Sequence, residues 1–486
     1  MSSNLVELPS RSLTLPSSIG SRDVAKYIHD VVWPAFDGER GRLQVIDAWA
    51  DGNQPDYARV AAKSPEKRAL FRLSKTPWLR LVVTTFAQCL YVSGYRREGD
   101  RENAAGPWQT WIANAMPHRQ IGLHRSALTY GYAFAMAERG TALDGANQAV
   151  LTAYSPRRLF ALYEDTVNDP WPKYALTLQP DGKTVRFWTD QVYYELDMPS
   201  PNEFPRPPRV VEHNTGVCPV VRYTNVMDLD GKTRGEVGPL IPVATRIDKT
   251  ELDLLYAQHY NSFKVKYATG ITDMAEATDE EAEAFKRRLE NDDILAHTSE
   301  HATFGTLDET PLDGFISSKQ THVETLAAIA QLPSDVLTGK LANLSAEALA
   351  SARANTEAKL AERKMTFGAS HAQLLRLSAL IEGDTESAND FTADVRWVDT
   401  SIRSLAQAVD AWGKAAQMLG MPREELWEFV PGVDEAKLQQ MKEHAMDNDE
   451  LTNMLRYYGM QDPNARAVSD PAERKGVPGA QPAFAA

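Results

Sequence analysis

Two changes in hydrophobic periodicity divide this sequence into three parts. From Ser21 to about 147, apolar residues recur at helical spacing, and they do so again from Leu240 onward. Between 148 and 226 they occur instead in short runs rich in Val, Leu, Tyr, Phe and Trp, which predict strands at 148–154, 158–163, 173–179, 183–189 and 191–196. The pattern therefore predicts an α+β fold, predominantly α, with a β-rich unit set into a helical chain.

Long amphipathic helices are expected after the β-rich unit. The first covers 240–268 and carries a polar side with Asp248, Lys249, Glu251 and Asp253. The second covers 315–331 and stops at Pro333, because proline has no N–H to donate and restricts the residue before it. A third begins at Ser345, with an apolar stripe at Leu349, Ala352, Thr356, Leu360 and Phe367. An acidic, mixed segment separates the first two.

Composition excludes several classes of protein. The chain has 486 residues, a length typical of about three domains. Its net charge of −14 argues against a protein that binds nucleic acid non-specifically. Cys89 and Cys218 are its only cysteines, so a disulfide scaffold and a cysteine-rich zinc module are excluded and a reducing compartment is expected. The most apolar run, Leu79–Val92, is too short to span a membrane, and no signal peptide is recognised.

No motif points to catalysis, a metal or a cofactor. Two Gly-Lys-Thr triplets lack the first glycine of a phosphate loop, since Thr177 and Val226 stand there, and hairpin turns explain both. His297 and His301 lie one helical turn apart without a third ligand nearby. The acidic run 279–293 offers paired carboxylates for a two-metal nuclease, but a solvated helix face is the simpler interpretation. A structural or assembly protein is therefore expected.

Three stretches, in a set order, resemble a known family. They are residues 216–225 (GVCPVVRYTN) with Gly235-Glu236 and 247–250 (IDKT) after them; residues 332–339 (LPSDVLTG), with 343–349 (NLSAEAL) and 366–368 (TFG); and residues 395–400 (VRWVDT) with 403–408 (RSLAQA). In this order and spacing they are similar to the portal proteins of tailed bacteriophages, particularly the branch common in phages of actinobacteria. The resemblance spans roughly 20–460, and Cys218, where relatives more often have an aliphatic residue, is its one departure.

The resemblance implies a fold of wing, stem, clip and crown, assembled as a ring of about twelve subunits. The corresponding segments would be an N-terminal arm 1–20, a wing 21–239 (α-rich 21–147, β-rich 148–226) joined by a strand at 391–399, a stem helix 240–268, a clip 269–314, a second stem helix 315–331, a tunnel loop 332–344, a tunnel helix returning to the wing 345–433, a crown 434–460 and a disordered tail 461–486.

The same resemblance implies partners and a place in the virion. Double-stranded DNA would pass through the ring at one capsid vertex, after assembly in the host cytoplasm. The terminase large subunit and then a head-completion adaptor would dock on the clip, at its acidic residues Glu280, Glu281, Glu283, Glu290, Asp292 and Asp293. The scaffold and the major capsid protein would meet the wing. No cofactor, metal or membrane is implied.

The tunnel loop is where the channel would narrow. Its candidate DNA-facing residues are Leu337, Lys340, Leu341 and Asn343, and Lys340 is the only cation in the loop. Repeated around a ring, Lys340 would form a circle of positive charge in an otherwise acidic channel. The alternative interpretation is that Lys340 points to solvent while Leu337 and Leu341 pack inward.

Two other classes of function stay open at this point. One is a different virion protein, such as a minor head or tail component. The other is an enzyme, such as a head-associated nuclease or protease. A ring with a central hole in electron micrographs would favour the portal, and reproducible turnover would favour the enzyme.

Overall fold

The structure is a computed structural model of the chain. It describes residues 21–54, 65–97, 103–142, 145–197, 207–262, 266–269, 303–306, 310–339, 346–398 and 405–422, with scattered positions up to 445. The chain divides into two compact units, Met1–Val398 and Asp399–Ala486, and each is considered by itself.

Helices dominate the described chain. They are α1 (Ser21–Tyr27), the π-helix η1 (Ile28–Val32), α2 (Trp33–Ala50), α3 (Pro65–Ser74), α4 (Trp78–Gln88), α5 (Ala105–Ala113), α6 (Met116–Tyr130), the 3-10 helix η3 (Gly238–Leu240), α7 (Ile241–Ser262), α9 (Asp313–Ala330), α10 (Ser334–Thr338), α11 (Ala346–Glu382), α12 (Thr385–Ala388) and α13 (Leu405–Leu419).

Fourteen described strands form five antiparallel sheets. They are β1 (Val92–Arg97), β2 (Tyr132–Thr141), β3 (Asn147–Tyr154), β4 (Leu159–Leu162), β5 (Tyr174–Leu178), β6 (Thr184–Trp188), β7 (Val192–Asp197), β8 (Arg209–Glu212), β9 (Val220–Thr224), β10 (Val226–Met227), β11 (Thr233–Arg234), β12 (Lys266–Thr269), β13 (Thr303–Thr306) and β14 (Ala393–Trp397). The sheet orders are β3-β2-β9, β4-β5-β6-β7-β8, and the pairs β1-β14, β10-β11 and β12-β13.

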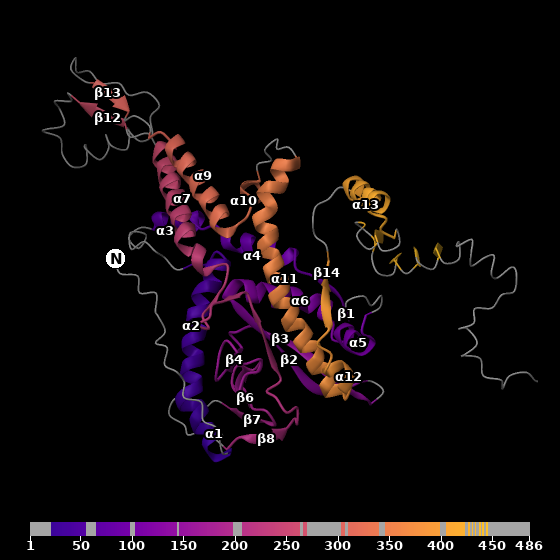
Figure 1. The fold of residues 1–486 in the computed structure, drawn as a ribbon. Coiled ribbons are helices and arrows are strands. Elements are labelled where there is room, and N and C mark those ends of the chain that lie inside the picture. Colours follow the sequence, from indigo (N-terminus) through magenta and orange to yellow (C-terminus); the bar gives the residue numbers. More distant parts are fainter. Residues whose placement is uncertain are drawn as a thin grey trace, which may run out of the picture. The chain divides into compact units, whose positions relative to one another are not determined.

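Alternation along β2 places the three-stranded sheet between two layers. Ala133, Ala135 and Ala137 belong to the core shared with α6 and α11, whereas Phe134 and Met136 belong to the core shared with the five-stranded sheet. Both faces of β2 are therefore buried, because successive side chains of a strand point to opposite faces. Small alanines on the helix side let α6 and α11 approach the sheet, and α11 is seen crossing it in Figure 1.

The five-stranded sheet is covered on its other face by the first helices. Leu176, Val185 and Phe187 alternate toward this face, and they form a separate core with Ile28 and Phe36. The order of layers in the first unit is thus helices, three-stranded sheet, five-stranded sheet and helices.

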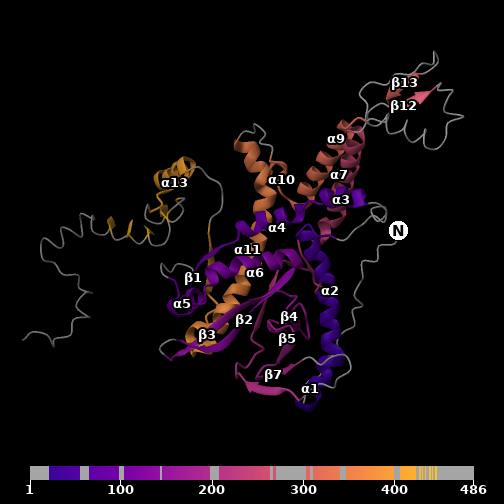
Figure 2. The ribbon, with the colours of Figure 1, turned by 180° about the vertical axis from the view of Figure 1, so that it is seen from behind.

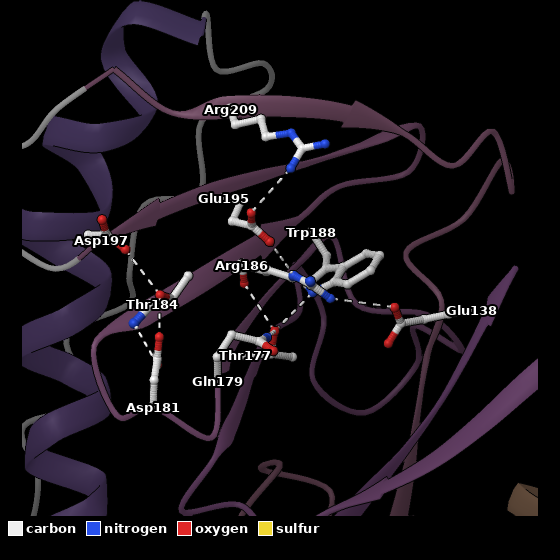
Figure 3. A network of polar contacts seen from close by, with 10 residues as sticks. All are labelled: Glu138, Thr177, Gln179, Asp181, Thr184, Arg186, Trp188, Glu195, Asp197 and Arg209. Atoms are coloured by element: carbon white, nitrogen blue, oxygen red, sulfur yellow. Dashed lines mark hydrogen bonds and ion pairs between the residues drawn. The ribbon is translucent and has the colours of Figure 1, made fainter. Parts of the chain in front are cut away.

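A polar network at the edge of the inter-sheet core joins the two sheets (Figure 3). Arg186 of β6 donates from Nε to Glu195 of β7 (2.7 Å) and lies 3.8 Å from Glu138 of β2. Deeper in the same interface, the indole N–H of Trp188 donates to the hydroxyl of Thr177 (3.1 Å). The polar side chains of Arg186 and Trp188 on this face therefore both have partners, as buried polar groups usually do.

The predicted strands of the β-rich unit are confirmed, and so are the turns that explain the Gly-Lys-Thr triplets. Gly182 has φ +69° in the β5–β6 hairpin, where the Asp181 carboxylate accepts the backbone N–H groups of Lys183 and Thr184. Gly231 has φ +76° in the β10–β11 turn, where Asp228 plays the same part. Both glycines supply the positive φ that a turn needs, so neither triplet is a phosphate loop.

The secondary structure differs from the sequence-based expectation in three places. The helical region before 148 contains β1 and β2, because β1 pairs with β14 and β2 is the centre of a sheet, two partnerships made by distant segments. The first long helix ends at Ser262, and β12 follows it. The segment after Pro333 contains the short helix α10. Helical periodicity over a few residues cannot exclude a buried strand.

The second unit contributes α13, a helix predicted from the sequence, over Leu405–Leu419. The crown segment 434–460 and the tail 461–486 lie outside the described residues, apart from a few positions. Within the described part of the chain, no helix is both long and apolar enough to cross a membrane.

Candidate functional site

Helices α7 and α9, the two expected stem helices, lie side by side and antiparallel in both views (Figures 1 and 2). Lys319 of α9 pairs with Glu251 of α7 at 2.5 Å. Val243, Ile247 and Leu254 of α7 are buried. Helix α7 is about 33 Å long at 1.5 Å per residue.

Two features close the base of the acidic insertion between these helices. The Asn261 side chain donates to the Thr310 carbonyl (2.9 Å) and accepts the Thr310 N–H (3.2 Å). Strands β12 and β13 pair with Lys266 opposite Thr306. The insertion therefore leaves and re-enters the helix pair at one place. The candidate docking residues Glu280, Glu281, Glu283, Glu290, Asp292 and Asp293 lie outside the described residues.

Asp248, expected on the polar side of α7, is instead fully buried. It accepts a hydrogen bond from the Gln54 amide (2.5 Å) and a longer one from the Thr76 N–H (3.4 Å). Burial raises the pKa of Asp248 to about 6, against the opposing effect of the Gln54 hydrogen bond. The sequence-based placement was wrong because two distant loop segments cover this side of the helix.

The candidate channel loop begins where α9 ends. Gln331 terminates α9 in the left-handed conformation (φ +60°), and Leu332 then turns into the core. Leu337 in α10 is 5 % exposed and belongs to the main core, which agrees with the inward-packing alternative for this residue. Gly339 ends α10 with φ +67°, a conformation that favours glycine. Lys340, Leu341 and Asn343 lie outside the described residues.

A buried ion cluster stands at the root of this loop. Lys359 of α11 donates to the Glu236 carboxylate (2.6 Å) and to the carbonyl of Ala330, the last residue of α9 (3.0 Å). Arg363, one turn further along α11, lies 3.4 Å from the other Glu236 oxygen. All three charged side chains are less than 10 % exposed. We call Glu236, Lys359 and Arg363 the root cluster.

The backbone around Glu236 is held by close contacts. The Glu236 N–H donates to the Leu128 carbonyl (2.7 Å), and the Asn225 side chain donates to the Glu236 carboxylate (3.0 Å). A Cβ at Gly235 would lie 2.3 Å from the Thr129 carbonyl oxygen. Asn225, Gly235 and Glu236 all belong to the first stretch that resembles portal proteins, so these residues meet at the root cluster.

A second buried polar network lies further toward the C-terminal end of α11. It is a row of hydrogen bonds through Tyr223, His371 and His124, which we call the histidine chain. The Tyr223 hydroxyl lies 2.9 Å from His371 Nδ1, His371 Nε2 lies 2.8 Å from His124 Nε2, and His124 Nδ1 lies 3.1 Å from the Leu90 carbonyl. A carbonyl only accepts, so His124 Nδ1 carries a proton. With both rings neutral, His371 then donates to His124, and Tyr223 donates to His371.

Burial keeps both rings neutral. It lowers the pKa of His124 to about 4, and burial followed by the nearby His124 lowers the pKa of His371 well below its usual value. Phe367 stacks on His124 with ring centroids 5.2 Å apart. Residues Tyr223 and Phe367, from two of the stretches that resemble portals, therefore meet here.

Sequence reasoning missed the root cluster, the histidine chain and the burial of Asp248. One signal was present: Lys359 and Arg363 stand one helical turn apart next to the apolar stripe of α11, where unpaired charges are not tolerated. Nothing in the sequence pairs Glu236 with residues more than 120 positions away.

The described residues hold no group of three metal-ligating side chains. Cys218 is buried and Cys89 is half-buried at the end of α4, and both are free thiols. Burial raises the pKa of the Cys218 thiol, which keeps it protonated and unreactive.

Comparison with known proteins identifies the family. The model of the family described as phage portal protein, SPP1 Gp6-like, matches residues 29–451. No curated protein matches the chain. A chain from the virion of a native gene transfer agent particle is 11 % identical, covering 74 % of this chain and 94 % of that one with a TM-score of 0.45. A chain from the neck of such a particle, computed with C12 symmetry, is 12 % identical, covering 76 % and 93 % with a TM-score of 0.42.

The family match extends from η1 to beyond α13 and includes every stretch that carried the resemblance. It decides against the two alternatives, a different virion protein and a head-associated enzyme. The chain belongs to the phage portal proteins of the SPP1 Gp6-like family, structural proteins of the virion that form the capsid portal.

Proposed function

We propose that about twelve copies of this chain form a ring around a channel for double-stranded DNA. The family match over residues 29–451 carries this proposal. In the proposed ring, α7 and α9 form the stem, the loop 332–344 contacts the DNA through its residues after Gly339, and α11 runs from the loop back to the wing. The direct passage from α9 through the loop to α11 supports this assignment, because a loop between two rigid helices can narrow a channel.

The remaining assignments concern partners. The wing, 21–239 with β14, contacts the scaffold and the major capsid protein. The clip, 269–314, docks the terminase large subunit and then the head-completion adaptor. We assign the chain to the branch common in phages of actinobacteria, and the order of residues 332–349 supports this assignment.

Ring formation is the first prediction. A single copy has a mass of 54.0 kDa, so a ring of about twelve should scatter light as a particle of roughly 650 kDa. Electron micrographs of the purified protein should show a central hole. A monomer at high protein concentration would contradict the proposal.

Deleting residues 275–305 should abolish binding of the packaging motor while rings still form. The deletion removes most of β13 but keeps the Asn261–Thr310 contact at the base of the insertion, so the helix pair should persist without it. Pull-down of the terminase large subunit by purified rings measures the effect. Full binding by a ring-forming deletion variant would refute the clip assignment.

Lys340→Glu should leave rings and procapsids intact but reduce packaged or retained DNA severalfold. The substitution replaces a circle of positive charge with a negative one that repels phosphate. The Lys340→Arg variant keeps the charge and should package normally. If Lys340→Glu capsids hold full-length DNA in normal amounts, the loop does not act on DNA through this residue.

A further inference from the structure

We infer that Lys359 of α11 is the positioning residue of the channel loop: it fastens the end of α9, where the loop begins, to α11, the helix that follows the loop, by donating directly to the Ala330 carbonyl while it also pairs with Glu236. The inference rests on the proposed role of 332–344 as the loop that faces DNA. It concerns how the loop root is held, which the family assignment does not specify.

Lys359 connects three separate parts of the chain. Its ammonium group donates to the Ala330 carbonyl at the end of α9 and to Glu236, which lies just before η3 and α7. It also lies 4.5 Å from the centre of the Phe86 ring of α4. The side chain itself comes from α11. One ammonium thus joins the end of α9, the segment that leads into α7 and the helix that follows the loop.

A neighbouring contact supports the same joint. The Thr356 hydroxyl, about one turn before Lys359 on α11, donates to the Gln331 carbonyl (2.5 Å). The carbonyls of Ala330 and Gln331 have no donor within α9, since the last carbonyls of a helix lack intrahelical partners. Side chains of α11 satisfy both, so α11 caps the end of α9.

The cluster is arranged so that removing Lys359 need not unfold the chain. Glu236 keeps its hydrogen bonds to Arg363 and Asn225, and Arg363 also pairs with the exposed Glu362 at 3.0 Å. The carboxylate therefore stays paired in the absence of Lys359. The Ala330 carbonyl, at the root of the loop, is the group that would be left without its donor.

Contacts to the core and within α10 hold the first part of the loop, from Leu332 to Gly339. Leu332 and Leu337 are buried in the main core, and the N–H groups of Val336 and Gly339 donate to the carbonyls of Pro333 and Asp335. The fastened part of the loop therefore reaches Gly339. Lys359 holds the described part of the loop, up to Gly339, which precedes the residues that the proposed function assigns to DNA contact.

The test is hydrogen–deuterium exchange on the full-length assembled protein, comparing Lys359→Met with wild type. Exchange of the amides from 330 to 339 should become about tenfold faster, as expected for loss of a charged hydrogen bond at a local opening. Amides of the inner half of α11 (371–381) and of β9 should exchange as in wild type. The matched control is Lys364→Met, which removes a lysine of the same helix outside the cluster and should leave residues 330–339 protected.

DNA retention supplies a second readout. Capsids with Lys359→Met portals should lose packaged DNA, while those with Lys364→Met should not. If wild-type protein forms no rings, the proposed function fails, yet the exchange pattern still reports whether Lys359 holds the loop root, so the two failures are distinguishable.

A double variant keeps the inference falsifiable if Lys359→Met does not fold. Glu236→Gln combined with Lys359→Met removes two of the three buried charges. The amide oxygen can still accept from Asn225 and Arg363, and Arg363 keeps its pair with the exposed Glu362. The double variant should fold and show the same local increase in exchange. Unchanged protection at 330–339, an equal increase across α11 and β9, or failure of both variants to fold would each overturn the assignment of Lys359 as a positioning residue.

Discussion

Gly235→Ala is expected to prevent stable folding, with a loss of about 3 kcal/mol or more in the free energy of unfolding. The added Cβ would lie 2.3 Å from the Thr129 carbonyl oxygen and 2.7 Å from the Gly131 nitrogen. Both are backbone atoms that cannot rotate away. The Glu236 N–H is bonded to the Leu128 carbonyl next to this contact, so moving the chain aside would also displace the root cluster.

Gly238→Ala is the matched control, because a Cβ there has no atom within 4 Å. Soluble yield and the thermal unfolding temperature measure both variants. The Gly238→Ala protein should resemble wild type, whereas the Gly235→Ala protein should be insoluble or unfold at a much lower temperature. Equal unfolding temperatures for the two would show that the close backbone approach at Gly235 does not constrain the fold.

Acid should destabilise the fold through the buried histidine chain. Below about pH 6.5 the unfolded chain takes up a proton at each histidine, whereas folded His124, with a pKa of about 4, does not. The stabilisation is therefore complete above pH 6.5 and is lost as the pH falls toward 4, by about 1.4 kcal/mol per pH unit for each such histidine. Asp248 acts in the opposite direction below about pH 6, because its folded pKa is raised, so the net loss there is closer to that of one histidine.

Urea unfolding followed by tryptophan fluorescence between pH 7.5 and 4.5 measures this loss. In the double variant His124→Gln, His371→Gln each position keeps a hydrogen-bond donor and an acceptor but cannot titrate, so the decline between pH 6.5 and 4 should shrink. His29→Gln, which changes a half-exposed histidine of η1, should decline as wild type does. A double variant with the wild-type pH profile would contradict the assignment of acid sensitivity to this chain.

Local patterns in the sequence predicted most of the secondary structure. Alternating and β-branched runs predicted β3 to β7 to within about two residues, and Pro180-Asp181-Gly182 predicted their hairpin, because turn chemistry acts within a few residues. Of the apolar stripe expected on α11, Phe367 is fully buried and Thr356 and Leu360 are partly buried, while the side chains of Leu349 and Ala352 lie outside the description. The order of three stretches predicted the family that the match to residues 29–451 confirms.

The site depended on partners that are remote in sequence. Asp248 has the pattern of a solvent-facing residue of α7, and it is Gln54, 194 positions away, that covers it. Lys359 and Glu236 are separated by 123 positions, and His371 and His124 by 247.

The sequence by itself therefore determined most of the elements and the family, because propensity, periodicity and turn chemistry are local properties of the chain, whereas β1 and β2 depended on strand partners elsewhere in the fold. Only the tertiary structure decided which polar side chains are buried together. The reason is physical: the free energy of a buried charge or imidazole depends on the few atoms that replace its water, and in this protein those atoms come from other elements of the fold.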